Sequence, residues 1–146
     1  FRFRDWPVYR DTRLFRIKVM KVVKTFPPEE KYALSDQAKR ALNSILLNLA
    51  EGANKNTDKD TRLFVNRAHC SLDEVVSCSD CALDDEYITE AQQKEILRDA
   101  DALAKQMKGF SMYLSRSVPV KDRGFSGVKD KGLKIKDSAP SSRIKD

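Results

Sequence analysis

The chain of 146 residues is long enough for one domain with a sizeable hydrophobic core and no more. Five glycines and five prolines are few, which favours long helices over a turn-rich β fold, and no apolar run approaches the ~18 residues of a membrane span. The net charge of +6, with a pI near 9.3, favours a polyanion as partner.

The first expected helix covers residues 6–25. Its apolar side chains share one side when residues are placed at about 100° each, the period of an α-helix. Pro7 fits the first turn, where its missing N–H costs nothing, and the run Phe26-Pro27-Pro28 ends the helix because proline disfavours helix at and before itself. The apolar side comprises Val8, Phe15, Val19, Val22, Val23 and Phe26.

The second expected helix covers residues 36–54. Ser35 is the expected N-cap, since a serine hydroxyl can accept from an unpaired backbone N–H of the first turn. Gly52 stands where the helix should end. The apolar side comprises Leu34, Ala38, Ala41, Leu42, Ile45 and Leu49.

Two more helices are expected, one that starts after Thr57 and runs to about Leu83 and one that starts after Thr89. Thr57 and Asp60 have the spacing of a capping box, and Thr89 with Gln92 makes a better one. All three connections are short, which forces neighbouring helices to be antiparallel. The chain is therefore predicted to be all-α, an antiparallel up-down-up-down four-helix bundle over residues 1–118.

The composition changes at Pro119, and residues 119–146 are predicted to form a basic, extended C-terminal tail. This tail has eight basic and four acidic residues, or +4 of the total +6. An apolar-Lys-Asp triplet occurs in it four times. The repetition is either chance within a solvated linker or a short linear motif that binds a partner surface or a nucleic acid. The tail residues expected to contact nucleic acid are Lys129, Lys131, Lys134 and Lys136.

No set of residues typical of catalysis is present in the sequence. His69 is the only histidine and is expected at the edge of an exposed face, and there is no glycine-rich phosphate loop. Cys78 is expected on the core side of its helix, whereas Cys81 and Cys70 lie on a flank about 16 Å apart. We therefore expect no enzymatic activity, no cofactor and no metal. Three cysteines, an odd number, favour a reduced, cytoplasmic protein.

A basic face is expected on the first helix. Arg10, Arg13, Lys21 and Lys24 fall within about 80° of one another, almost opposite the apolar side, with Arg16 flanking them and only Asp11 interrupting. Such a row of cations could follow a phosphate backbone. The neighbouring Phe1, Phe3, Trp6 and Tyr9 could stack on unpaired bases. The alternative is an ordinary solvated face, with the aromatic side chains closing the end of the bundle.

Several apolar residues fall outside the predicted core sides. A monomeric bundle has little use for them, and self-association would bury them. The residues predicted for this oligomer interface are Leu14, Ile17, Leu46, Leu47 and Leu63.

The sequence resembles a known family over roughly residues 3–115. The segments that carry the resemblance are residues 26–34 (FPPEEKYAL), residues 48–52 (NLAEG), Phe64, Ala68, Ser71-Leu72 and Glu74. They are similar to the four-helix-bundle proteins encoded within intervening sequences of 23S ribosomal RNA, a family related to the accessory variability proteins of diversity-generating retroelements. The resemblance implies a ring-forming, pentameric bundle without enzymatic activity. For the retroelement branch it also implies nucleic-acid binding through a basic surface and a reverse transcriptase as partner.

Two hypotheses follow for the function. The first is an oligomeric accessory protein that binds RNA or DNA with its first helix and its tail, alongside a reverse transcriptase. The second is a protein-interaction scaffold whose tail docks a protein partner and whose basic face is merely solvated. Neither involves a membrane.

Overall fold

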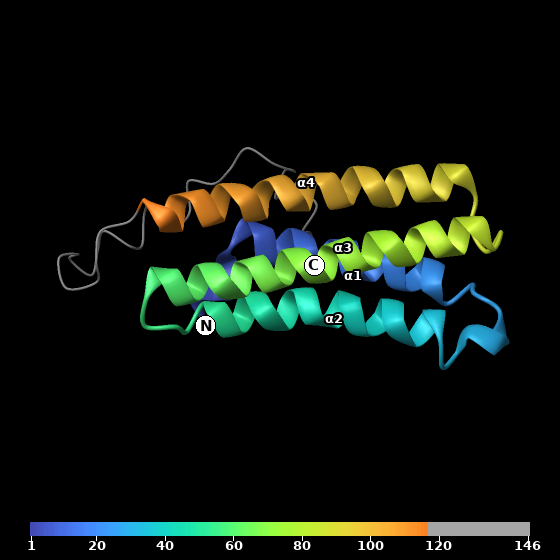
Figure 1. Ribbon diagram of the computed structural model, residues 1–146, viewed down its shortest axis with the longest axis horizontal. Helices are drawn as coiled ribbons and strands as arrows, with labels where there is room; N and C mark the ends of the chain where they lie inside the picture. The colour runs from blue at the N-terminus through green and yellow to red at the C-terminus, as the bar shows by residue number, and fades with distance from the viewer. Residues whose placement is uncertain (117–146) are drawn as a thin grey trace.

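Four antiparallel helices make up most of residues 1–116, the part of the chain that the computed structural model describes (Figure 1). They are α1 (Pro7–Val23), α2 (Leu34–Gly52), α3 (Asp58–Asp84) and α4 (Glu90–Ser115), and the 3-10 turns η1 (Arg2–Asp5) and η2 (Pro28–Glu30) precede α1 and α2. Each helix runs opposite to the one before it. The all-α four-helix bundle is therefore confirmed. No helix within these residues is long and apolar enough to cross a membrane.

The predicted tail, with Lys129, Lys131, Lys134 and Lys136, lies outside the described residues.

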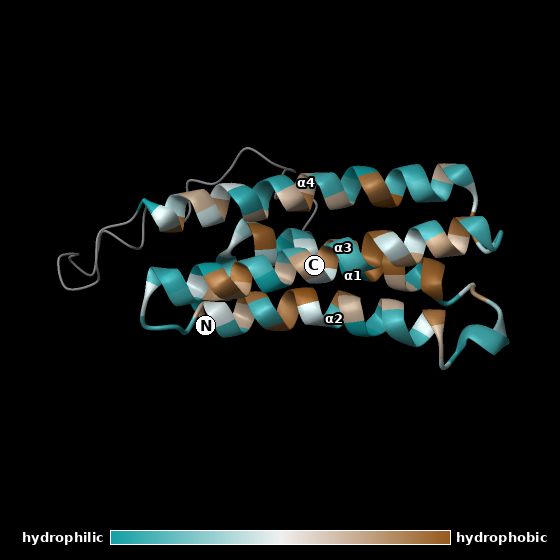
Figure 2. Cartoon of the chain, in the orientation of Figure 1, coloured by the Kyte–Doolittle hydropathy of each residue, from teal (hydrophilic) through white to brown (hydrophobic). Residues whose placement is uncertain are grey.

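The hydrophobic core is built from the apolar sides of all four helices. Figure 2 shows hydrophobic and hydrophilic residues alternating along every helix, as expected for helices with one buried side. The innermost side chains, all less than 2% exposed, include Leu42, Ile45, Leu49, Leu72 and Met107. They come from three helices and belong to one core cluster, to which α1 adds Val8, Phe15, Val19 and Val23.

The N-caps predicted for the third and fourth helices, Thr57 and Thr89, are both confirmed. The Thr89 hydroxyl oxygen accepts from the Gln92 backbone N–H at 3.2 Å, and the Gln92 side-chain oxygen accepts from the Thr89 backbone N–H at 2.9 Å, which completes a capping box. Thr57 accepts from the Asp60 backbone N–H at 3.1 Å. The Thr57 hydroxyl also donates to the Asp60 carboxylate at 2.8 Å. The Asp60 side chain does not accept from the Thr57 backbone N–H, so the capping box at the start of α3 is incomplete.

The prediction that Ser35 caps the second helix is wrong. Helix α2 begins one residue earlier, at Leu34, and Ser35 is buried within its first turn. The acceptor comes instead from η2, because the Glu30 carboxylate accepts from the Leu34 backbone N–H at 3.0 Å. A carboxylate near a helix N-terminus also interacts favourably with the helix dipole.

Glu30 also joins the two connections at this end of the bundle. Its second carboxylate oxygen accepts from the Tyr87 hydroxyl at 2.9 Å, and Phe26 packs on the Tyr87 ring with 5.7 Å between ring centroids. The hydrogen bond to Glu30 raises the pKa of Tyr87 to about 12. The α1–α2 and α3–α4 connections are thus tied together.

Helix α2 ends at Gly52, where the sequence predicted its end. The backbone dihedral of Gly52 is nevertheless one that any residue could adopt, so a left-handed helix cap is not the reason for glycine here. A Cβ atom built on it would lie 2.8 Å from Cβ of Phe64 and 3.4 Å from the carbonyl oxygen of Thr61. Glycine is therefore required here because α2 and α3 approach closely.

We expect Gly52→Ala to lower the free energy of unfolding by about 1–3 kcal/mol, the usual cost of overpacking. Alanine is otherwise preferred to glycine in a helix by roughly 0.5–1 kcal/mol, so a loss would identify steric contact as the dominant effect. Urea unfolding of the two proteins measures it, and Gly52→Val should lose more. Unchanged or increased stability of Gly52→Ala would contradict the steric role.

Candidate nucleic-acid interface

Positive charge is concentrated at the N-terminal end of the chain. Residues 1–26 have eight basic and two acidic side chains, a net charge of 8 − 2 = +6, whereas residues 27–116 have twelve basic and sixteen acidic, a net charge of 12 − 16 = −4. Most of the first segment is helix α1. The described bundle is therefore basic on α1 and acidic elsewhere.

The four cations predicted for the basic face lie along the outer side of α1, with Lys24 as the residue that caps its C-terminal end. Arg13, Lys21 and Lys24 are exposed, and Arg10 is half-buried. Within residues 1–116, no carboxylate forms an ion pair with any of them. We define these four residues as the α1 basic face. Binding a phosphate there would not require breaking an ion pair with any other residue of 1–116.

Asp11 does not interrupt this face, contrary to the prediction. Its side chain turns inward and is only 7% exposed, and it accepts a hydrogen bond of 2.7 Å from the side-chain amide of Gln106 on α4. Pairing with a buried donor offsets part of the cost of removing a carboxylate from water. The outer side of α1 is consequently free of acidic side chains.

Arg16 lies beside the α1 basic face but is engaged with α2. It is half-buried, and its Nε donates to the side-chain oxygen of Asn43 at 2.8 Å. Its predicted role in phosphate contact stays a prediction. The hydrogen bond positions the guanidinium at the border between α1 and α2.

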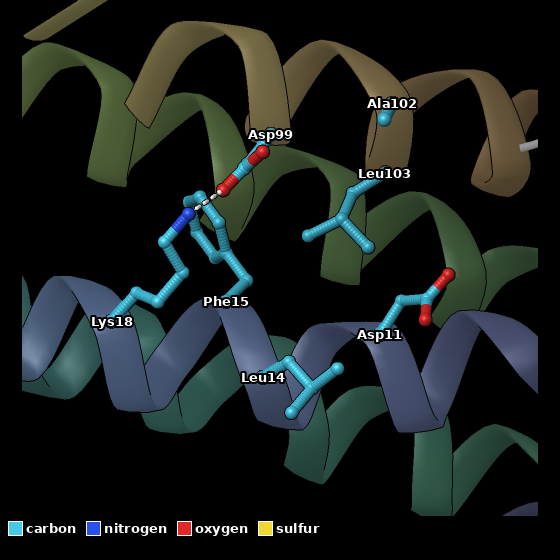
Figure 3. A pocket seen from close by; sticks show the side chains of 7 residues that line it. All are labelled: Asp11, Leu14, Phe15, Lys18, Asp99, Ala102 and Leu103. Atoms are coloured by element: carbon cyan, nitrogen blue, oxygen red, sulfur yellow. Dashed lines mark hydrogen bonds and ion pairs between the residues drawn. The ribbon is translucent and has the colours of Figure 1, made fainter. Parts of the chain in front are cut away.

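Lys18 marks the other border of the face, toward α4 (Figure 3). Its ammonium lies 2.7 Å from the Glu95 carboxylate and 2.6 Å from that of Asp99. Burial alone would lower the pKa of Lys18, but the hydrogen bonds and charges of Asp99 and Glu95 raise it overall. The hydrogen bond from Lys18 lowers the pKa of Glu95. Lys18 is neutralised by α4 and is a poor candidate for phosphate contact.

The aromatic residues near the N-terminus mostly close the end of the bundle. Trp6 packs edge-on against Phe110, and Phe3 packs edge-on against Tyr9, each with 4.9 Å between ring centroids. Phe1 is 97% exposed. The structure therefore favours the capping interpretation for Phe3, Trp6 and Tyr9 over stacking on bases.

The predicted oligomer-interface residues occupy three helices. Ile17 of α1, Leu47 of α2 and Leu63 of α3 are exposed, whereas Leu14 and Leu46 are half-buried. Leu14 lines a groove between α1 and α4. Two further exposed apolar side chains, Tyr32 next to η2 and Met112 of α4, were not predicted from the sequence. Neither stood out in the sequence, because isolated exposed apolar residues are common.

Cysteine and histidine positions agree with the helical placement. Cys78 is buried, Cys70 and Cys81 are exposed, and His69 is half-buried with Nε2 4.0 Å from the Asp73 carboxylate. In residues 1–116, no three side chains of His, Cys, Asp or Glu come together as metal ligands would.

We expect two of the three cysteines to react with a maleimide in the folded protein at pH 7. Burial raises the pKa of the Cys78 thiol to about 11, which leaves little thiolate, and its side chain is also shielded. Mass spectrometry of the labelled protein should find Cys70 and Cys81 modified and Cys78 modified only after unfolding. Rapid labelling of Cys78 without denaturant would show that α3 packs less tightly than described.

Comparison with known proteins gives the same architecture. A crystal structure of a protein of unknown function from the S23 ribosomal protein family of Bacteroides thetaiotaomicron superposes with a TM-score of 0.66. The two chains are 21% identical, and the match covers 71% of this chain and 97% of that one. No curated protein matches.

The model of the 23S rRNA-intervening sequence protein family matches residues 4–109. The chain belongs to this family. The matched residues of this 23S rRNA-intervening sequence protein include all of the α1 basic face and most of α4, and they end before residues 119–146. Among the matched residues, Arg67 is exposed, and its guanidinium carbon lies 4.7 Å from the centroid of the Phe64 ring.

Proposed function

We propose that this 23S rRNA-intervening sequence protein is a non-enzymatic, homo-oligomeric protein that binds nucleic acid through the α1 basic face. The observation that carries the proposal is that the four cations of the α1 basic face, three of them exposed, have no ion-pair partner within residues 1–116. Each cation that contacts a phosphate releases condensed counterions, which drives binding regardless of sequence.

The dimensions of the face suit a nucleic-acid backbone. From Arg10 to Lys24 the chain advances 14 residues, or about 21 Å at 1.5 Å per residue. This length spans roughly six base pairs at 3.4 Å each. The hydrogen bond between Arg16 and Asn43 would hold a fifth cation beside the row.

Self-association is supported by apolar side chains that the monomer leaves in water. Leu47 of α2 is 67% exposed and Leu63 of α3 is 48% exposed. Assembly would bury such residues and bring several basic faces together, so that weak contacts add through effective concentration. We propose a ring, with five copies as the resemblance to accessory variability proteins implies, and a retroelement reverse transcriptase as its protein partner.

Nucleic-acid binding by the full-length protein across a salt series, with mass determined in the same samples, tests the proposal. Tight binding by an oligomer that weakens steeply with salt supports it. An oligomer with no binding at low salt would contradict the nucleic-acid role. That outcome would favour the scaffold hypothesis, in which deletion of residues 119–146 removes a protein partner.

A further inference from the structure

The α1 basic face is not a continuous row of cations, because an apolar side chain interrupts it at the centre. Ile17 is 47% exposed. Arg13 and Lys21 lie four residues before and after it. Arg10 lies seven residues before it, and Lys24, whose backbone is still right-handed helical, lies seven residues after it. At about 100° per residue, all four cations fall within about 40° of Ile17 around the helix axis. The face therefore consists of two pairs of cations with one aliphatic side chain between them.

The two cations next to Ile17 in the sequence are held by the neighbouring helices. Arg16 donates to the side-chain oxygen of Asn43 on α2 at 2.8 Å. On the other side, Lys18 pairs with carboxylates of α4, that of Asp99 at 2.6 Å among them (Figure 3). At the level of Ile17 the outer side of α1 is therefore apolar, and the cations of the α1 basic face stand at its two ends.

The spacing of the two pairs suits two phosphate backbones better than one. The centres of the pairs are 11 residues apart in the sequence, or about 16 Å at 1.5 Å per residue. Proteins that bind single strands usually combine such cations with aromatic side chains on which the bases stack. Between Arg10 and Lys24 the aromatic residue is Phe15, which is only 3% exposed. The face therefore lacks a stacking surface for a single strand and fits the two strands that border a groove of a duplex.

Helix α1 is too deeply embedded in the bundle to enter a deep groove. Within Pro7–Val23 the exposed residues are Arg13, Ile17 and Lys21, which form a single line along the helix. The major groove of B-form DNA admits an α-helix, but it is about 8.5 Å deep and the helix must insert to reach its floor. The minor groove of B-form DNA is only about 6 Å wide, much less than the ~16 Å between the two pairs. The minor groove of A-form RNA is wide and shallow, so a narrow line of side chains can span it.

We propose that the α1 basic face binds double-stranded RNA by lying across its minor groove. Arg10 and Arg13 contact phosphates of one strand. Lys21 and Lys24 contact phosphates of the other strand, and Ile17 lies over the shallow groove between them. This inference rests on the proposed nucleic-acid binding and adds the type of nucleic acid to it. Because the cations contact the phosphate backbone, we expect no preference for a particular RNA sequence.

Fluorescence anisotropy of the full-length protein with three labelled ligands of the same sequence tests the inference. The ligands are an RNA duplex of about 16 base pairs, one of its strands alone and the corresponding DNA duplex. A ligand that reaches only one pair of cations loses about two phosphate contacts, so the RNA duplex should bind at least about tenfold more tightly than the others at 50 mM salt. A single strand or a DNA duplex that binds as tightly as the RNA duplex would overturn the inference and leave nucleic-acid binding in place. If none of the three binds at low salt, the proposed function fails as well.

Ile17→Glu tests the position of Ile17 in the same assay. A carboxylate at the centre of the face would lie between two phosphate backbones, so the affinity for the RNA duplex should fall at least about tenfold. Met112→Glu in α4 is the matched control, because Met112 is 45% exposed and the change in charge is the same, and it should lose less than about threefold. Equal losses in the two variants would contradict the inference. A lower mass of the Ile17→Glu assembly without nucleic acid would contradict it too, because Ile17 would then lie between copies of the chain.

Discussion

Reversing the charge of Arg10, Arg13, Lys21 and Lys24 to glutamate is expected to lower nucleic-acid affinity roughly 10³- to 10⁴-fold at 50 mM salt. Counterion release makes each phosphate contact worth about tenfold at that concentration, and four contacts multiply. The slope of log affinity against log salt should also fall by about 3–4. Fluorescence anisotropy with a labelled oligonucleotide over a salt series measures both quantities.

The matched control reverses Lys59, Arg62, Lys94 and Lys108, which are exposed on α3 and α4. It changes the net charge by the same amount and should leave most of the affinity in place. Equal losses in the two quadruple variants would show that overall charge, and not the α1 basic face, governs binding. Circular dichroism of each variant shows whether the helices are retained.

Replacing Leu49 by alanine is expected to lower the free energy of unfolding by about 2–5 kcal/mol. Leu49 is 0% exposed in the hydrophobic core, so its removal loses buried apolar area and leaves a cavity. Urea unfolding measures the change. A loss below about 1 kcal/mol would mean that the surrounding helices close the cavity.

Leu47 offers a matched comparison two residues away on the same helix. Because it is exposed in the described bundle, Leu47→Ala should change the stability of a monomer by no more than about 0.5 kcal/mol. If Leu47 lies in the proposed oligomer interface, the same substitution should lower the mass of the assembly measured by light scattering. An assembly of unchanged mass would remove Leu47 from the interface.

The elements that could be predicted from the sequence depend on local patterns. Apolar periodicity located the four helices, and the capping box of Thr89 and Gln92 located the start of α4, because both signals lie within a few neighbouring residues. The position of Cys78 on the core side followed from the same periodicity.

The features that escaped prediction depend on partners distant in the sequence. Asp11 was expected on the surface, but it is hydrogen-bonded to Gln106, 95 residues away. Ser35 was expected to cap α2, but Glu30, which is also held by Tyr87, provides the acceptor. The tight packing at Gly52 depends on Phe64 of the next helix. No single-helix pattern contains this information.

The uneven distribution of charge has a consequence for the kinetics of association. Within residues 1–116, the +6 of residues 1–26 and the −4 of residues 27–116 give the bundle a charge dipole as well as a net charge. The electric field of a polyanion orients such a dipole so that α1 faces the polyanion before the two surfaces touch. More encounters therefore begin in a productive orientation. The association rate should therefore fall with ionic strength more steeply than it would for a protein of equal net charge spread evenly over its surface.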